Sequence, residues 1–199
     1  MALTKTEIPN EILRAFQAGV DDILNENDAV RRRLQAAEVV GVRTFTLGLD
    51  EIQRARKPYN LIPAGWRILA TDRDGLVVSA DVAQSGNQTR VVSISTDPAG
   101  GELAKSLKYV DELAAQMPQA LTVSLLRIPG VLVDALVLAG QPGTEDVMVP
   151  IRAPDDSFEL MRKYTVDEFF SRIASPPVDR LGEPSLLQRF LEFNEVQPR

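Results

Sequence analysis

Cysteine and histidine are both absent from this chain of 199 residues. Without cysteine, the protein has no disulfide framework, no thiolate nucleophile and no thiolate metal site. Without histidine, it lacks the commonest general base and the commonest metal ligand, which excludes a catalytic triad of the usual kind. The lack of cysteine fits a reducing compartment, and we expect a cytoplasmic protein.

Long apolar runs are also missing. No stretch of about 18 apolar residues occurs, and residues 1–10 contain no apolar run of signal-peptide length. We therefore expect neither a membrane span nor secretion. Lysine and arginine number 22 against 28 aspartates and glutamates, so the net charge is −6. Because phosphate binding needs a clustered positive field, this balance argues against a nucleic-acid partner.

What remains is an average globular composition, with 44% apolar and 25% charged residues. A chain of this length can bury roughly two-thirds of the surface that its unfolded form exposes, so it needs no disulfide or metal to fold. We expect a single domain over residues 1–199. Within it we expect an N-terminal helical region over 1–60, a sheet with one inserted helix over 61–152, and a C-terminal helical region over 153–199.

The N-terminal region begins with a helical pattern. Apolar side chains recur at helical spacing from Ile8 to Val20, which predicts a helix over 9–24. A second helix is predicted over 27–37. The composition then becomes β-branched over 39–46, which favours an extended segment.

The centre of the chain has the composition of a sheet. Apolar alternation and turn residues predict strands at 66–71, 76–82, 91–95, 121–128, 131–138 and 147–151, with a helix at about 101–117. The turns between successive strands are too short for parallel crossovers. The predicted fold class is α+β, with a mainly antiparallel sheet of about six strands covered by N-terminal, central and C-terminal helices.

The C-terminal region becomes helical again. Thr165 and Glu168 are spaced as a capping box, which predicts the start of a helix. A final amphipathic helix is predicted over 184–193, and we favour its docking on its own domain. If it docks on another chain instead, the terminal helices would form the contacts of a homo-oligomer.

No motif names a chemical reaction. Asp134 stands alone in an apolar strand, where we favour a paired or strand-end carboxylate over an acid with a raised pKa. Asp72, Asp74 and Gly75 match the start of a calcium loop, but the later ligands are missing, so a hairpin turn is favoured. The loop at 96–101 lacks phosphate-loop spacing. We predict no catalytic residue, no metal ligand and no cofactor.

Four residues are candidates for binding a protein partner: Trp66, Asp72, Asp74 and Asp81. Trp66 is the only tryptophan. An exposed tryptophan would anchor a partner, whereas a buried one would close the edge of the core, and we favour the buried arrangement. The three aspartates belong to the first predicted hairpin, where they would attract a basic partner.

Three segments together resemble the pattern of the SUKH superfamily. They are IPNEILRAF at 8–16 in the opening helix, IPAGW at 62–66 leading into the sheet, and YTVDEFFSRI at 164–173 in a closing helix. Many SUKH members act as immunity proteins that bind and neutralise bacterial toxins. The resemblance therefore implies a non-enzymatic protein whose acidic surface covers a basic toxin.

The function expected from the sequence is that of a non-enzymatic protein-binding protein, with an immunity or antitoxin-like role as its narrower form. The first alternative is an enzyme that uses carboxylates with a divalent cation, or a serine and lysine pair, because those chemistries do not need histidine. The second alternative is a structural or assembly subunit that makes its contacts through the terminal helices.

Overall fold

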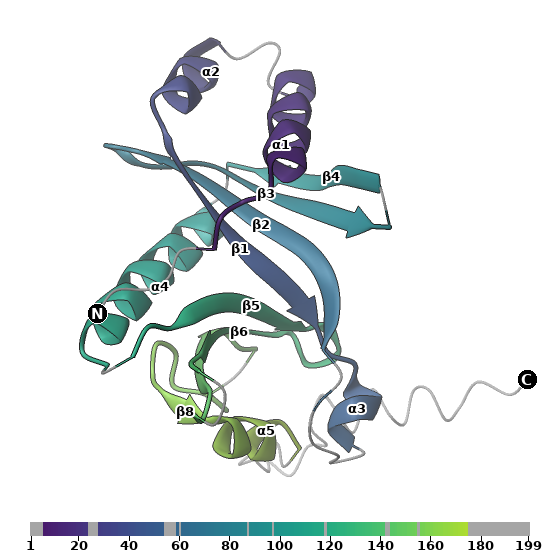
Figure 1. The fold of residues 1–199 in the computed structure, drawn as a ribbon, viewed down its shortest axis with the longest axis vertical. Helices are drawn as coiled ribbons and strands as arrows, with labels where there is room; N and C mark the ends of the chain where they lie inside the picture. The colour runs from purple at the N-terminus through teal and green to yellow at the C-terminus, as the bar shows by residue number, and fades with distance from the viewer. Residues whose placement is uncertain are drawn as a thin grey trace, which may run out of the picture.

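The structure is a computed structural model that describes residues 6–23, 28–53, 59, 61–86, 88–96, 98–117, 119–141, 144–154 and 156–174. At its centre lies one eight-stranded sheet with the order β4-β3-β2-β1-β5-β6-β7-β8 (Figure 1). The strands are β1 (Glu38–Thr46), β2 (Ile62–Asp72), β3 (Gly75–Ser85), β4 (Gln88–Ser95), β5 (Thr122–Ile128), β6 (Val133–Ala139), β7 (Val147–Arg152) and β8 (Tyr164–Thr165). The helices are α1 (Asn10–Ile23), α2 (Asp28–Gln35), α3 (Leu49–Gln53), α4 (Pro98–Ala115) and α5 (Val166–Ala174).

Each half of the sheet is an antiparallel meander. The first half contains β1 to β4 and the second half contains β5 to β8, and consecutive strands pair within each half. The turn between β2 and β3 uses Gly75, whose φ of +116° suits glycine. A short 3-10 helix at Pro129–Val131 connects β5 to β6. Connections this short allow only antiparallel neighbours.

The two halves meet through a parallel pair, which corrects the predicted fold class. Four residue pairs join β1 to β5, from Arg43 opposite Ser124 to Thr46 opposite Arg127. The prediction of a mainly antiparallel sheet of about six strands is therefore wrong, because the sheet is mixed and has eight strands. The α+β class holds only as the broad statement that the fold combines helices with a sheet. Short connections account for the antiparallel pairing from β2 to β4 and from β5 to β7, but they carry no information on how the two halves meet.

One face of the first half is covered by α1 and α2. α1 lies so close to β4 that a Cβ on Gly19 would come within 2.7 Å of a Val91 methyl group, so a larger residue would push the helix away. The core between this helix and the strands contains Ile12, Phe16, Val20, Trp66, Ile68, Ala70, Val78, Ala80 and Val82.

The same face of the second half is covered by α3 and α5. Phe45 of β1 packs against this second core, and alternation along the strand places it on the same face as Gly41, which contacts Ile8. The buried side chains are Leu47, Ile52, Leu126, Ile128, Val133, Ala135, Val137, Met148, Phe158, Tyr164, Phe169, Phe170 and Ile173.

The opposite face of the sheet is covered by α4. This helix contacts β3 of the first half and β7 of the second half, so it crosses the junction between them (Figure 1). Its core contains Val42, Leu69, Leu103, Val110, Leu113, Ala114, Leu121, Leu125, Leu136, Leu138 and Val149.

The helices expected at 9–24 and 27–37 are confirmed as α1 and α2. The helix expected at 101–117 is confirmed as α4, although it begins earlier, at Pro98. The capping box is confirmed as well: Thr165 N–H donates to Glu168 Oε2 at 3.0 Å, and Glu168 N–H donates to Thr165 Oγ1 at 3.2 Å. The helix predicted over 184–193 lies outside the described residues.

Candidate functional site

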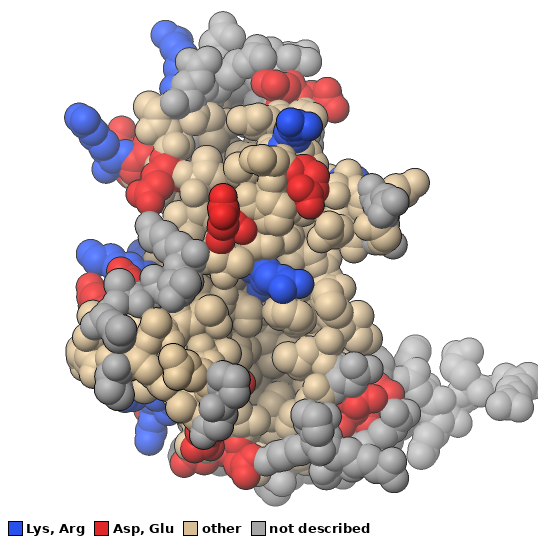
Figure 2. Space-filling view, in the orientation of Figure 1, with Lys and Arg blue, Asp and Glu red and all other residues tan. Residues whose placement is uncertain are grey.

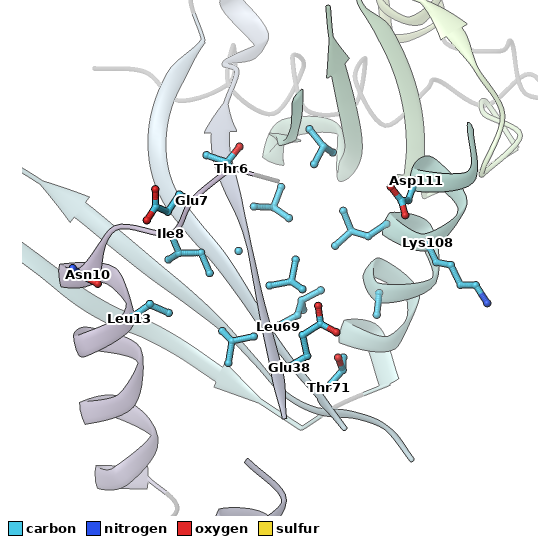
Figure 3. Close-up of a pocket in the computed structure, with 17 residues that line it drawn as sticks. Thr6, Glu7, Ile8, Asn10, Leu13, Glu38, Leu69, Thr71, Lys108 and Asp111 are labelled. Atoms are coloured by element: carbon cyan, nitrogen blue, oxygen red, sulfur yellow. The ribbon is translucent and has the colours of Figure 1, made fainter. Parts of the chain in front are cut away.

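A cavity of about 610 Å³ lies where the two halves of the sheet diverge (Figure 3). β1 pairs with β5 only from Arg43 onward, so the first part of β1 separates from the second half. The space that opens is bounded by β1, by α4 and by residues 6–8, which precede α1. A volume of this size falls within the range of roughly 300–1,000 Å³ that is typical of ligand sites.

The walls of the cavity are mainly apolar. Val40 and Val42 of β1 and Leu69 of β2 lie on the sheet side, and Leu107 projects from α4. Ile8, from the segment before α1, closes another side. Val42 and Leu69 also belong to the core beneath α4, so the cavity continues that core toward solvent.

Charged side chains form the rim of the cavity. Glu7, Glu38 and Asp111 supply three carboxylates, and Lys108 supplies the single cation among the lining residues. Figure 3 shows that the Lys108 amine points away from the cavity. The rim is therefore acidic, whereas acidic and basic side chains are interspersed on the face that Figure 2 shows.

The backbone of β1 forms an open edge beside the cavity. On its other side β1 pairs with β2 along its whole length, from Glu38 opposite Thr71 to Thr46 opposite Ile62. On the cavity side, no strand among the described residues pairs with 39–42. In an antiparallel pair, alternate residues direct their N–H and C=O groups away from the partner strand, so part of this edge faces outward.

None of the four predicted partner-binding residues lines this cavity. Trp66 is 5% exposed and packs in the core beneath α1, which confirms the favoured buried arrangement. Asp72 accepts hydrogen bonds from Arg33 Nε at 2.6 Å and Nη2 at 2.9 Å, and these bonds hold its carboxyl pKa below the ordinary value. Asp74 is exposed at the hairpin turn. A partner-binding role for these residues stays a prediction.

Asp81 and Asp134 belong to a chain of alternating charges on the α4 face of the sheet. Arg127 lies 3.5 Å from Asp81 and 3.6 Å from Asp134, so it joins the two carboxylates. Arg67 Nε is 3.0 Å from Asp81 Oδ1, but its N–H is not directed at the oxygen, and the contact is a charge attraction without a hydrogen bond. Asp134 is thus paired with Arg127, which confirms the favoured interpretation of a paired carboxylate.

Metal-binding clusters are absent from the part of the chain that the structure describes, where no three acidic residues are grouped closely enough to hold an ion. The loop considered as a phosphate site at 96–101 overlaps the first turns of α4. None of the described helices is long and apolar enough to span a membrane.

No protein-family model, curated protein or solved structure matches the chain. The resemblance to the SUKH superfamily therefore stays a prediction.

Gly41 is a sign of the cavity that was present in the sequence and not used. Gly41 lies in a β-branched segment, and an isolated glycine in a strand often marks the close approach of another group. In the structure a Cβ at this position would lie 2.6 Å from the Ile8 side chain, so Gly41 lets the segment before α1 pass over β1. The separation of β1 from β5 has no comparable local sign, because it depends on strands far apart in the sequence.

Proposed function

We propose that this chain is a non-enzymatic protein-binding protein that holds a segment of its partner in the cavity between β1 and α4. The observation that carries this proposal is the combination of an apolar cavity with an open strand edge. A peptide offers both apolar side chains and backbone hydrogen-bonding groups, so it can use both features at once.

An immunity or antitoxin-like role is the narrower form of this proposal. A net charge of −6 would speed the approach of a basic partner, and the acidic rim would favour the same partner at the cavity. The absence of cysteine supports a cytoplasmic site of action.

Selection from a display library of random peptides, with the immobilised full chain as bait, tests the proposal. We expect selected peptides to bind the wild-type protein with micromolar dissociation constants, a range common for short peptides in grooves. Ala104→Trp, which places a large ring in the cavity, should weaken this binding at least tenfold.

Ala174→Trp at the exposed end of α5 provides the matched control, because it adds the same ring outside the cavity. Circular dichroism and thermal unfolding establish that each variant folds, and Leu107→Gln replaces Ala104→Trp if the larger ring prevents folding. Failure to select any peptide, or equal binding by the cavity and control variants, would contradict the proposed function.

A further inference from the structure

We infer that the partner segment binds as an added β-strand along residues 39–42 of β1, and that this strand alternates apolar and basic side chains. This inference rests on the proposed function and specifies the conformation and chemistry of the ligand. It is carried by three features of the cavity: the backbone edge, the apolar floor and the charges of the rim.

The backbone edge favours an extended ligand. β1 already accepts a parallel neighbour over Arg43–Thr46, where β5 pairs with it, so its outer edge has the geometry of a strand that can be extended. Residues 39–42 continue this edge for about 13 Å at the spacing of a strand. An incoming strand would occupy the place that β5 leaves as it diverges, and its main-chain groups would satisfy the outward N–H and C=O groups of β1.

The apolar floor and the acidic rim determine which side chains such a strand needs. Successive side chains of a strand point to opposite faces, so one set would meet Val42 and Leu107 on the α4 face, and the other would meet Ile8 and Glu7 on the opposite face. Glu7 is an exposed carboxylate of the rim on that opposite face, whereas Lys108, the cation among the lining residues, lies on α4 with its amine pointing away from the cavity. Lysine or arginine at the alternate positions would therefore be attracted, and glutamate would be repelled.

An amphipathic helix is a poorer ligand for the same cavity. A helix is about 10–12 Å wide with its side chains, and its backbone groups are already bonded within the helix. It would leave the outward groups of 39–42 without a protein partner, and only its apolar face would contribute to binding. The strand uses the edge and the floor together.

The test uses a heptapeptide of alternating lysine and valine, with acetylated and amidated ends, added to the isotope-labelled full chain. Nuclear magnetic resonance gives the dissociation constant and the exchange rates of the β1 amides. We expect saturable binding and at least tenfold slower exchange of the outward amides among 39–42. A glutamate and valine heptapeptide of the same length should bind about tenfold more weakly.

Two further measurements separate strand addition from binding by side chains alone. The valine N–H groups lie on one edge of the peptide strand and the lysine N–H groups on the other, so one peptide is N-methylated at its valines and a second at its lysines. One of the two should bind at least tenfold more weakly if the backbone pairs with β1. Glu7→Gln should weaken the lysine peptide about threefold at low salt, as expected for one exposed charge pair. Glu11→Gln is the matched control, since Glu11 is likewise an exposed glutamate but does not line the cavity.

Peptide binding without protection of 39–42, or undiminished binding of both N-methylated peptides, would overturn strand addition while leaving peptide binding in the cavity intact. Equal affinities for the lysine and glutamate peptides would overturn the basic preference. If neither these peptides nor any library peptide binds, the proposed function itself fails.

Discussion

The two halves of the sheet share a meander topology but are stabilised in different ways. In the first half β2 and β3 are 11 residues long, and α1 packs on them through mostly aliphatic side chains. In the second half β6 and β7 have only 7 and 6 residues. The described ring pairs all belong to the core of this half, where the ring centroid of Phe169 lies 4.9 Å from that of Phe158 and 5.2 Å from that of Phe170.

The cores of the two halves are therefore filled in different ways. Short strands offer little surface, so the second half buries large rings, each of which hides roughly 150–250 Å². The first half has long strands, a close backbone approach at Gly65 and an exposed ion pair between Arg33 and Asp72. The two halves should therefore respond differently to changes in side-chain size, backbone geometry and pH.

The largest expected effect is the loss of a central ring from the second half. Phe169 is fully buried and contacts two other rings, so Phe169→Ala should lower the free energy of unfolding by about 4 kcal/mol. Ile12→Ala is the counterpart in the first half, at an equally buried position, and should cost about 3 kcal/mol. Denaturation in urea measures both values. A smaller loss for Phe169→Ala than for Ile12→Ala would remove the distinction between the two cores.

The next effect tests the dependence of the first half on close backbone approach. Gly65 has a φ of +128°, and a Cβ there would clash with the carbonyl oxygen of Val82. Gly65→Ala should therefore cost about 3 kcal/mol, from both the backbone conformation and the clash.

Gly75→Ala is the matched control for this change, since its φ of +116° is similar but no atom lies within 4 Å of the added Cβ. It should cost only about 1–2 kcal/mol, from the conformation alone. Equal losses in urea denaturation would show that contact between β2 and β3 at Gly65 is not a constraint.

The smallest effect concerns pH. The hydrogen bonds from Arg33 lower the pKa of Asp72 in the folded state, so the unfolded state binds the proton more readily. This contribution to stability is fully present above the unfolded pKa of about 3.9 and is lost as the pH falls through the lower folded value.

Asp72→Asn should therefore lower the melting temperature slightly at pH 7, and the gap to wild type should shrink below about pH 4. Thermal unfolding from pH 7 to pH 3 measures the gap. Asp74→Asn is the control, because Asp74 occupies the same turn but forms no ion pair among the described contacts. A gap that stays constant down to pH 3 would contradict a role for the Asp72 charge.

Local patterns predicted the parts of the fold that depend on neighbouring residues. Helical spacing identified α1, and the Thr165 and Glu168 pair identified the start of α5, because both signals lie within a few turns of the chain. The parallel contact of β1 with β5 was missed, since these strands are separated in the chain by α3, by β2 to β4 and by α4. The cavity was missed for the same reason: its walls come from 6–13, from β1 and β2, and from α4.

The position of α4 also determines how the chain folds as a whole. This helix follows the strands of the first half and precedes those of the second, and it contacts β3 and β7. It is thus the closing helix of one half and the opening helix of the other. A break in the chain on either side of α4 would leave one half without the helix that covers its face. Because the shared helix packs on both halves, we expect the described part of the protein to unfold in one cooperative transition.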